Sequence, residues 1–79
     1  MKRRAYNELE ARAYQIGVNE AKTLKRNVAP VQSKPMNELM NQVKNNLLPL
    51  LRAFNQGVYN EMSRQAWAAL KKMEQEARA

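Results

Sequence analysis

Both glycines of this chain lie in one pattern that occurs twice, RAYQIGV at residues 12–18 and RAFNQGV at residues 52–58. An Asn-Glu pair follows each pattern, at residues 19–20 and, after one extra residue, at 60–61. A glycine inside a helix costs ~1 kcal/mol relative to alanine, so a glycine at the same place in both patterns indicates a helix surface kept bare for a close neighbour. The two stretches are either a duplicated docking face or the chance reuse of a good helical sequence.

Gly17 and Gly57 are expected on apolar helix faces, each at a point where another helix approaches closely. In a simple antiparallel hairpin with its turn near Gln32, residue 17 would face about residue 47. The sequence therefore predicts that the two glycines have different neighbours or that they meet across a subunit boundary. At least one of them is expected to contact a partner outside this chain.

The first helix is predicted over residues 4–28, where apolar and small residues recur every three or four positions up to Val28. Pro30 is expected to end this helix, because the residue before a proline is disfavoured in helical geometry. Residues 29–35 are predicted to form a loop. Ser33 in this loop is a candidate N-cap for the next helix.

Helical spacing resumes at Met36 and continues to Ala77, with Pro49 inside it. Two outcomes compete: one kinked helix over about 36–77, or a break between a helix over about 36–47 and another over about 49–77. We favour the break, which puts the proline in a first turn. The fold class is all-α, a helical hairpin or a small three-helix arrangement in one domain over 1–79, and a chain this short favours an oligomer or a bound partner.

The amino-acid composition excludes most kinds of catalytic and metal site. The chain has 79 residues with no cysteine and no histidine, which removes disulfides, zinc fingers, thiolate nucleophiles and imidazole bases. The seven acidic residues are scattered and form no acid–base pair, and there is no glycine-rich phosphate loop. We therefore expect a non-enzyme with no catalytic residue, no cofactor, no metal and no small-molecule substrate. No secretory signal and no apolar run of membrane-spanning length is visible, and a cytoplasmic or virion location is expected.

The formal charge of +7 is concentrated in the N-terminal part of the chain, since residues 1–28 carry seven basic and three acidic groups. Such a positive field attracts nucleic acid, acidic proteins and anionic membranes alike. The candidate anion or nucleic-acid contacts lie on one side of the first helix and at its end: Arg12, Lys22, Lys25 and Arg26. Lys2, Arg3 and Arg4 lie upstream and add to the same charge.

Candidate partner contacts besides the glycines are Trp67 and an amide ridge formed by Asn37, Asn41 and Asn45 at four-residue spacing. Trp67 either closes the edge of the core or is an exposed anchor for a partner. The amide ridge is either a solvated face or a contact surface. The methionines of the second half are expected in the core, although methionines also build adaptable binding surfaces.

The sequence favours a protein-binding module: a small basic adaptor, inhibitor or assembly component of a larger protein or nucleoprotein machine, of phage or mobile-element type. Its expected partners are another protein or a second copy of itself. The alternative is a nucleic-acid-binding regulator that uses the basic face of the first helix. A membrane-surface helix is the weakest hypothesis, because the basic residues are spread out among amides and glutamates.

Overall fold

The computed structural model describes the backbone of residues 2–43, 45 and 47–78, and the side chains at these positions from Glu8 onward. Its elements are α1 (Lys2–Leu24), a 3-10 turn η1 (Pro30–Gln32), α2 (Lys34–Val43) and α3 (Leu47–Arg78). No strand occurs within the described ranges, and the predicted all-α class is confirmed.

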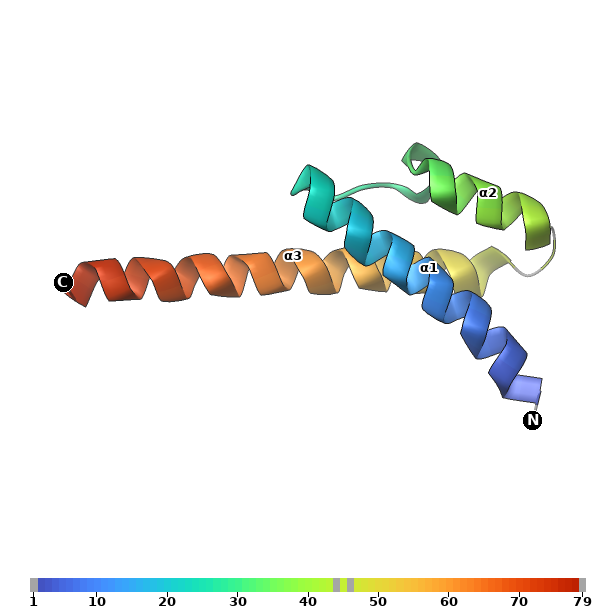
Figure 1. The fold of residues 1–79 in the computed structure, drawn as a ribbon, viewed down its shortest axis with the longest axis horizontal. Coiled ribbons are helices and arrows are strands. Elements are labelled where there is room, and N and C mark those ends of the chain that lie inside the picture. Colours follow the sequence, from blue (N-terminus) through green and yellow to red (C-terminus); the bar gives the residue numbers. More distant parts are fainter. Residues whose placement is uncertain (1, 44, 46, 79) are drawn as a thin grey trace.

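The long helix α3 is the axis of the molecule, and α1 crosses it while α2 lies near its N-terminal end (Figure 1). The C-terminal half of α3 projects away from both other helices. The principal extents are 53 × 29 × 14 Å and the radius of gyration is 15.4 Å. A compact domain of this length would have a radius of gyration of about 12 Å, so the projecting helix accounts for the elongated shape.

The first helix ends at Leu24, four residues before the predicted end at Val28. Lys25 takes a left-handed conformation with φ 55°, and its N–H still donates to the Ala21 carbonyl at 2.8 Å. A left-handed residue terminates a helix, so α1 stops before Pro30 exerts any effect. Val28 is nevertheless buried, because the connector carries it back onto the core.

The predicted loop over 29–35 contains the turn η1 and the beginning of α2. The Ser33 hydroxyl accepts a hydrogen bond from the Met36 N–H at 3.3 Å, which confirms Ser33 as the N-cap. The helix therefore begins at Lys34, two residues earlier than predicted.

A break, and not a kinked continuous helix, separates α2 from α3: α2 ends at Val43 and α3 begins at Leu47. Residues 44 and 46 lie outside the described positions. Pro49 is the third residue of α3, and its missing N–H is harmless there because first-turn N–H groups have no helical partner.

The two glycines meet at a single crossing of α1 and α3, so the prediction of different neighbours is wrong. A Cβ on Gly17 would press on the Phe54 carbonyl oxygen and lie 3.2 Å from the Val58 nitrogen. A Cβ on Gly57 would press on the Tyr14 carbonyl oxygen and lie 3.2 Å from the Val18 nitrogen. Each glycine thus lets the other helix's backbone approach, as expected of a bare helix surface.

Counting residues along a simple antiparallel hairpin gave the wrong neighbours for the glycines because the chain is not a simple hairpin. The connector, η1 and α2 intervene, and α3 returns across α1 with a shift of 40 residues. The two copies of the repeated pattern therefore pack on each other reciprocally, since Tyr14 and Val18 stand in the first copy where Phe54 and Val58 stand in the second. Both glycines are buried within the chain, so the partner contact predicted at Gly17 or Gly57 is replaced by an intramolecular one.

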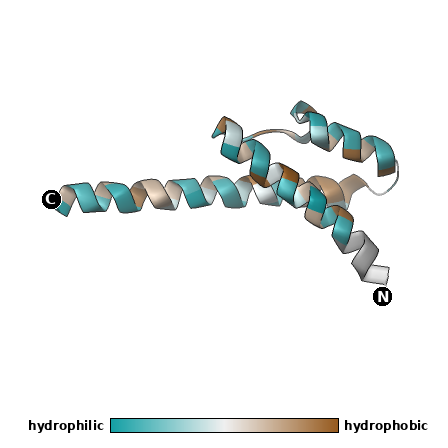
Figure 2. Ribbon diagram, in the orientation of Figure 1, coloured by the Kyte–Doolittle hydropathy of each residue, from teal (hydrophilic) through white to brown (hydrophobic). Residues whose placement is uncertain are grey.

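The core lies around this crossing, where apolar segments of the helices gather (Figure 2). Its largest fully buried side chains are Phe54, Met36 and Leu50, one from α2 and two from α3. The buried hydrophobic residues are Ala13, Ala21, Val28, Met36, Leu39, Leu50, Phe54 and Val58.

The predicted core stripe does not continue along α3. Every described residue from Ala66 to Arg78 is exposed, and Met73 is 63% exposed, so the expectation of a methionine core fails at its C-terminal end. Successive steps of four residues rotate a stripe by about 40° each around the helix axis. Four such steps, from Leu50 to Ala66, turn the stripe by about 160°, away from α1. Beyond Ala66 all sides of α3 are exposed, because no described segment lies beside this half of the helix.

Candidate functional site

Two surfaces of the described structure are candidate partner sites, and the first is the projecting half of α3. We call its apolar side the outer face, formed by Tyr59, Ser63, Ala66, Leu70, Met73 and Ala77. Tyr59 is 67% exposed and Leu70 is 50% exposed. Trp67 lies beside this face and is 67% exposed, so it does not close the edge of the core. Large apolar side chains at this exposure are typical of a contact surface.

The second surface is a basic groove between the end of α1 and the middle of α3. Its lining residues are Lys22, Lys25, Glu61, Arg64, Gln65 and Ala68. The fold thereby brings two of the predicted anion contacts, Lys22 and Lys25, together with Arg64. Sequence reasoning missed Arg64 because no local pattern links it to residues about 40 positions earlier.

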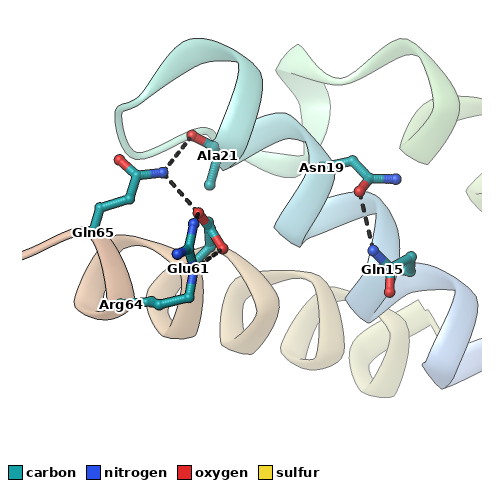
Figure 3. Close-up of polar contacts among 6 residues, drawn as sticks. All are labelled: Gln15, Asn19, Ala21, Glu61, Arg64 and Gln65. Atoms are coloured by element: carbon teal, nitrogen blue, oxygen red, sulfur yellow. Dashed lines mark hydrogen bonds and ion pairs between the residues drawn. The ribbon is translucent and has the colours of Figure 1, made fainter. Parts of the chain in front are cut away.

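Glu61 forms the floor of the basic groove. It is 4% exposed and accepts hydrogen bonds from Arg64, at 2.6 and 3.0 Å, and from the Gln65 amide at 2.9 Å (Figure 3). The same Gln65 amide donates to the Ala21 carbonyl at 3.3 Å, which ties α3 to the last turn of α1. Hydrogen bonds from Arg64 and Gln65 lower the pKa of Glu61 to about 2 against the effect of burial. The carboxylate therefore positions Arg64 at the groove.

The ionised Glu61 should make stability depend on pH. Because its folded pKa is about 2 and its ordinary value is 4.5, its stabilising contribution is complete above pH 4.5 and is lost as the pH falls toward 2. We expect Glu61→Gln to lower the thermal unfolding midpoint at pH 7, with the deficit relative to wild type shrinking at pH 2. Circular dichroism melts across this range measure it. Glu74→Gln, at an exposed carboxyl of α3, is the matched control, and an equal deficit for Glu61→Gln at both pH values would contradict the assignment.

The remaining predicted contacts are not brought together. Asn37 donates its side-chain amide to the Val31 carbonyl at 2.9 Å and so stabilises the connector. Asn41 is exposed on α2, but Asn45 lies beyond the end of this helix, so the predicted amide ridge on one helix is wrong.

Arg12 and Arg26 are exposed, and neither lines the basic groove. Arg12 lies ten residues before Lys22, which is about 15 Å along α1. Arg26 lies past the end of α1 and donates to the Asn27 carbonyl at 3.3 Å. The side chains of Lys2, Arg3 and Arg4 lie outside the described ones.

Nowhere in residues 2–43, 45 and 47–78 is there a helix with both the length and the apolar character that a bilayer crossing needs. The same part of the chain holds no group of three acidic, histidine or cysteine side chains arranged to bind a metal ion. Comparison with protein-family models, curated proteins and solved structures yields no match.

Proposed function

We propose that this chain is a non-enzymatic protein-binding module, an adaptor, inhibitor or assembly component, that holds its partner on the outer face of α3. The observation that carries the proposal is the exposure of Trp67, Leu70 and Met73 at 67%, 50% and 63% on a helix that projects from the fold. Tryptophan is among the residues that most often dominate the energetics of protein interfaces, and the apolar side chains around it exclude water. A partner that covers this face would remove them from water.

The length of the projection supports the same proposal. An isolated helix of fewer than about 12–15 residues is marginal in water, because helix nucleation is costly and most helix stability in proteins comes from packing. Residues 66–78 are all exposed, so this segment has little packing against the rest of the described structure. Burial of one side against another protein would stabilise this segment.

Capture from cell extract tests the proposal. Tagged protein is incubated with extract that has been treated with nuclease, and the complexes are analysed by native mass spectrometry. We expect nuclease-resistant complexes that are lost in Leu70→Asp and retained in Gln75→Asp, which adds the same charge on the other side of α3. Complexes that vanish with nuclease, or that survive Leu70→Asp unchanged, would contradict the proposal.

An anionic partner such as nucleic acid is the second candidate, and the basic groove favours it. The groove is lined by three cationic side chains, Lys22, Lys25 and Arg64, against one carboxylate, Glu61, which is paired with Arg64. The net positive charge that remains favours phosphate groups. The net charge of +7 would draw such a partner to the surface.

If the groove contacts phosphates, changing Lys22 and Lys25 together to glutamine should flatten the salt dependence of DNA binding. Each lost contact reduces the slope of log K against log salt by about 0.9 for duplex DNA, so the pair should reduce it by about 1.8. Fluorescence anisotropy with a labelled duplex, from low to physiological salt, measures the slope. Changing the exposed Lys34 and Lys71 to glutamine removes the same charge elsewhere, and an equal reduction in that control would assign the effect to net charge alone.

A further inference from the structure

The outer face of α3 has the spacing of a coiled-coil seam. Its residues are separated by alternating steps of four and three: Tyr59, Ser63, Ala66, Leu70, Met73 and Ala77. A repeat of this kind, with a mean period of 3.5 residues, is the pattern by which two helices pair along their length. Five of the six positions are exposed and Ser63 is half-buried, so the seam is open to a second helix.

The seam points away from the rest of the fold. Glu61 is buried beside α1, and Leu70 follows it by nine residues, which is a rotation of about 180° around the helix axis. The α1 crossing at Gly57 therefore occupies the opposite side of α3. A helix can lie along residues 59–77 without displacing α1.

We infer that the occupant of this seam is α3 of a second copy of this chain, paired in the antiparallel direction. This inference rests on the proposed function and names its partner. It follows from the sizes of the seam residues in α3, and the distribution of charge along the whole chain supports the same direction.

Size complementarity favours the antiparallel direction. Centred near residue 68, that arrangement places Tyr59 opposite Ala77 of the second copy, Ser63 opposite Met73, and Ala66 opposite Leu70. Every layer then joins one large and one small side chain, which fills the space between the helices evenly. A parallel pair would instead set alanine against alanine and tyrosine against tyrosine. Trp67 lies beside the centre of the antiparallel seam, where it covers the edge of the interface.

Charge favours the same direction. Residues 1–58 contain ten basic and four acidic residues, a net charge of +6, whereas residues 59–79 contain four basic and three acidic residues, a net charge of +1. Antiparallel pairing puts the two strongly positive parts at opposite ends of a paired segment about 28 Å long. That length exceeds the screening distance of about 8 Å at physiological salt, whereas parallel pairing would bring the two parts together.

Sedimentation equilibrium of the purified chain from 5 to 500 μM tests the pairing. We expect a concentration-dependent dimer whose dissociation constant rises at least about tenfold in Leu70→Asp and stays near the wild-type value in Gln75→Asp. Far-UV circular dichroism of both variants at the lowest concentration checks that the fold is retained, as expected for exposed positions. A wild-type monomer at 500 μM, or an unchanged dimer in folded Leu70→Asp, would overturn the inference.

Disulfide trapping tests the direction, and the chain is suited to it because it has no cysteine. Tyr59→Cys and Ala77→Cys are prepared as copies of different mass, mixed in equal amounts and oxidised mildly. Antiparallel pairing predicts the mixed disulfide as the main product. A predominance of homodimeric disulfides from Tyr59→Cys would overturn the antiparallel assignment.

The outcomes separate this inference from the proposed function. The purified chain could stay monomeric while a different protein is captured in a Leu70-dependent manner. That result would exclude the second copy as the partner but would still support the protein-binding module. If neither dimerisation nor capture of another protein is observed, both the antiparallel pairing and the protein-binding module are excluded.

Discussion

Gly57→Ala is expected to lower the thermal unfolding midpoint by about 10–20 °C, which corresponds to about 2–3 kcal/mol for a chain of this size. The added Cβ would press on the Tyr14 carbonyl oxygen and lie 3.1 Å from the carbonyl carbon. These are backbone atoms of another helix, and they cannot rotate away as a side chain can. The two helices must separate, and the core between them loses its packing.

The gain in helix stability from replacing a glycine with alanine is small compared with this loss of packing. Alanine stabilises a helix interior by ~1 kcal/mol relative to glycine, which does not offset the separation of the helices. Gly17→Ala should behave in the same way, because its Cβ meets the Phe54 carbonyl group reciprocally. Asn55→Ala, at an exposed position of α3, is the control and should leave the midpoint near that of wild type. A midpoint that rises in either glycine variant would show that the crossing is not a backbone contact.

Phe54→Ala is expected to reduce the free energy of unfolding by about 3–5 kcal/mol. Phe54 is 0% exposed and is the largest fully buried side chain, so its removal leaves a cavity where α1, α2 and α3 meet. Small domains have little stability in reserve, and the variant should be largely unfolded near room temperature. Urea unfolding followed by far-UV circular dichroism measures the loss.

Trp67→Ala provides the contrast for Phe54→Ala. Both changes remove an aromatic side chain from α3, but Trp67 is 67% exposed. At a low protein concentration, where association does not contribute, Trp67→Ala should change the free energy of unfolding by less than about 0.5 kcal/mol. A comparable loss in both variants would place Trp67 in the core.

Local signals in the sequence were sufficient to predict that the helices exist, but not to place all of their ends. Proline restricts its own backbone and that of its neighbour, so the position of Pro49 indicated the break between α2 and α3. Ser33 indicated the start of α2 because an N-cap acts within three residues of itself. The end of α1 was predicted too late, since a lysine carries no local signal for the left-handed conformation that Lys25 adopts.

The positions of the candidate surfaces could not be predicted from local sequence, because they depend on the rotation of residues around the α3 axis and on contacts between residues far apart in the chain. A stripe of residues spaced by four looked like one face in the sequence, but its rotation around α3 divides it into a core side near Phe54 and an outer face near Leu70. The basic groove joins Lys25 to Arg64, and only the crossing of α1 and α3 brings these residues together.

The sequence by itself determined the all-α class, a break in the helix shortly before Pro49 and the need for a close helix contact at Gly17 and Gly57, because each follows from the conformational preferences of a few neighbouring residues. The break lies between Val43 and Leu47, a few residues earlier than predicted. The tertiary structure alone decided that the two glycines meet each other. That pairing depends on how the connector and α2 turn the chain before α3 returns. The same turn leaves the C-terminal half of α3 without a neighbour in the described chain, and so determines which face is open to a partner.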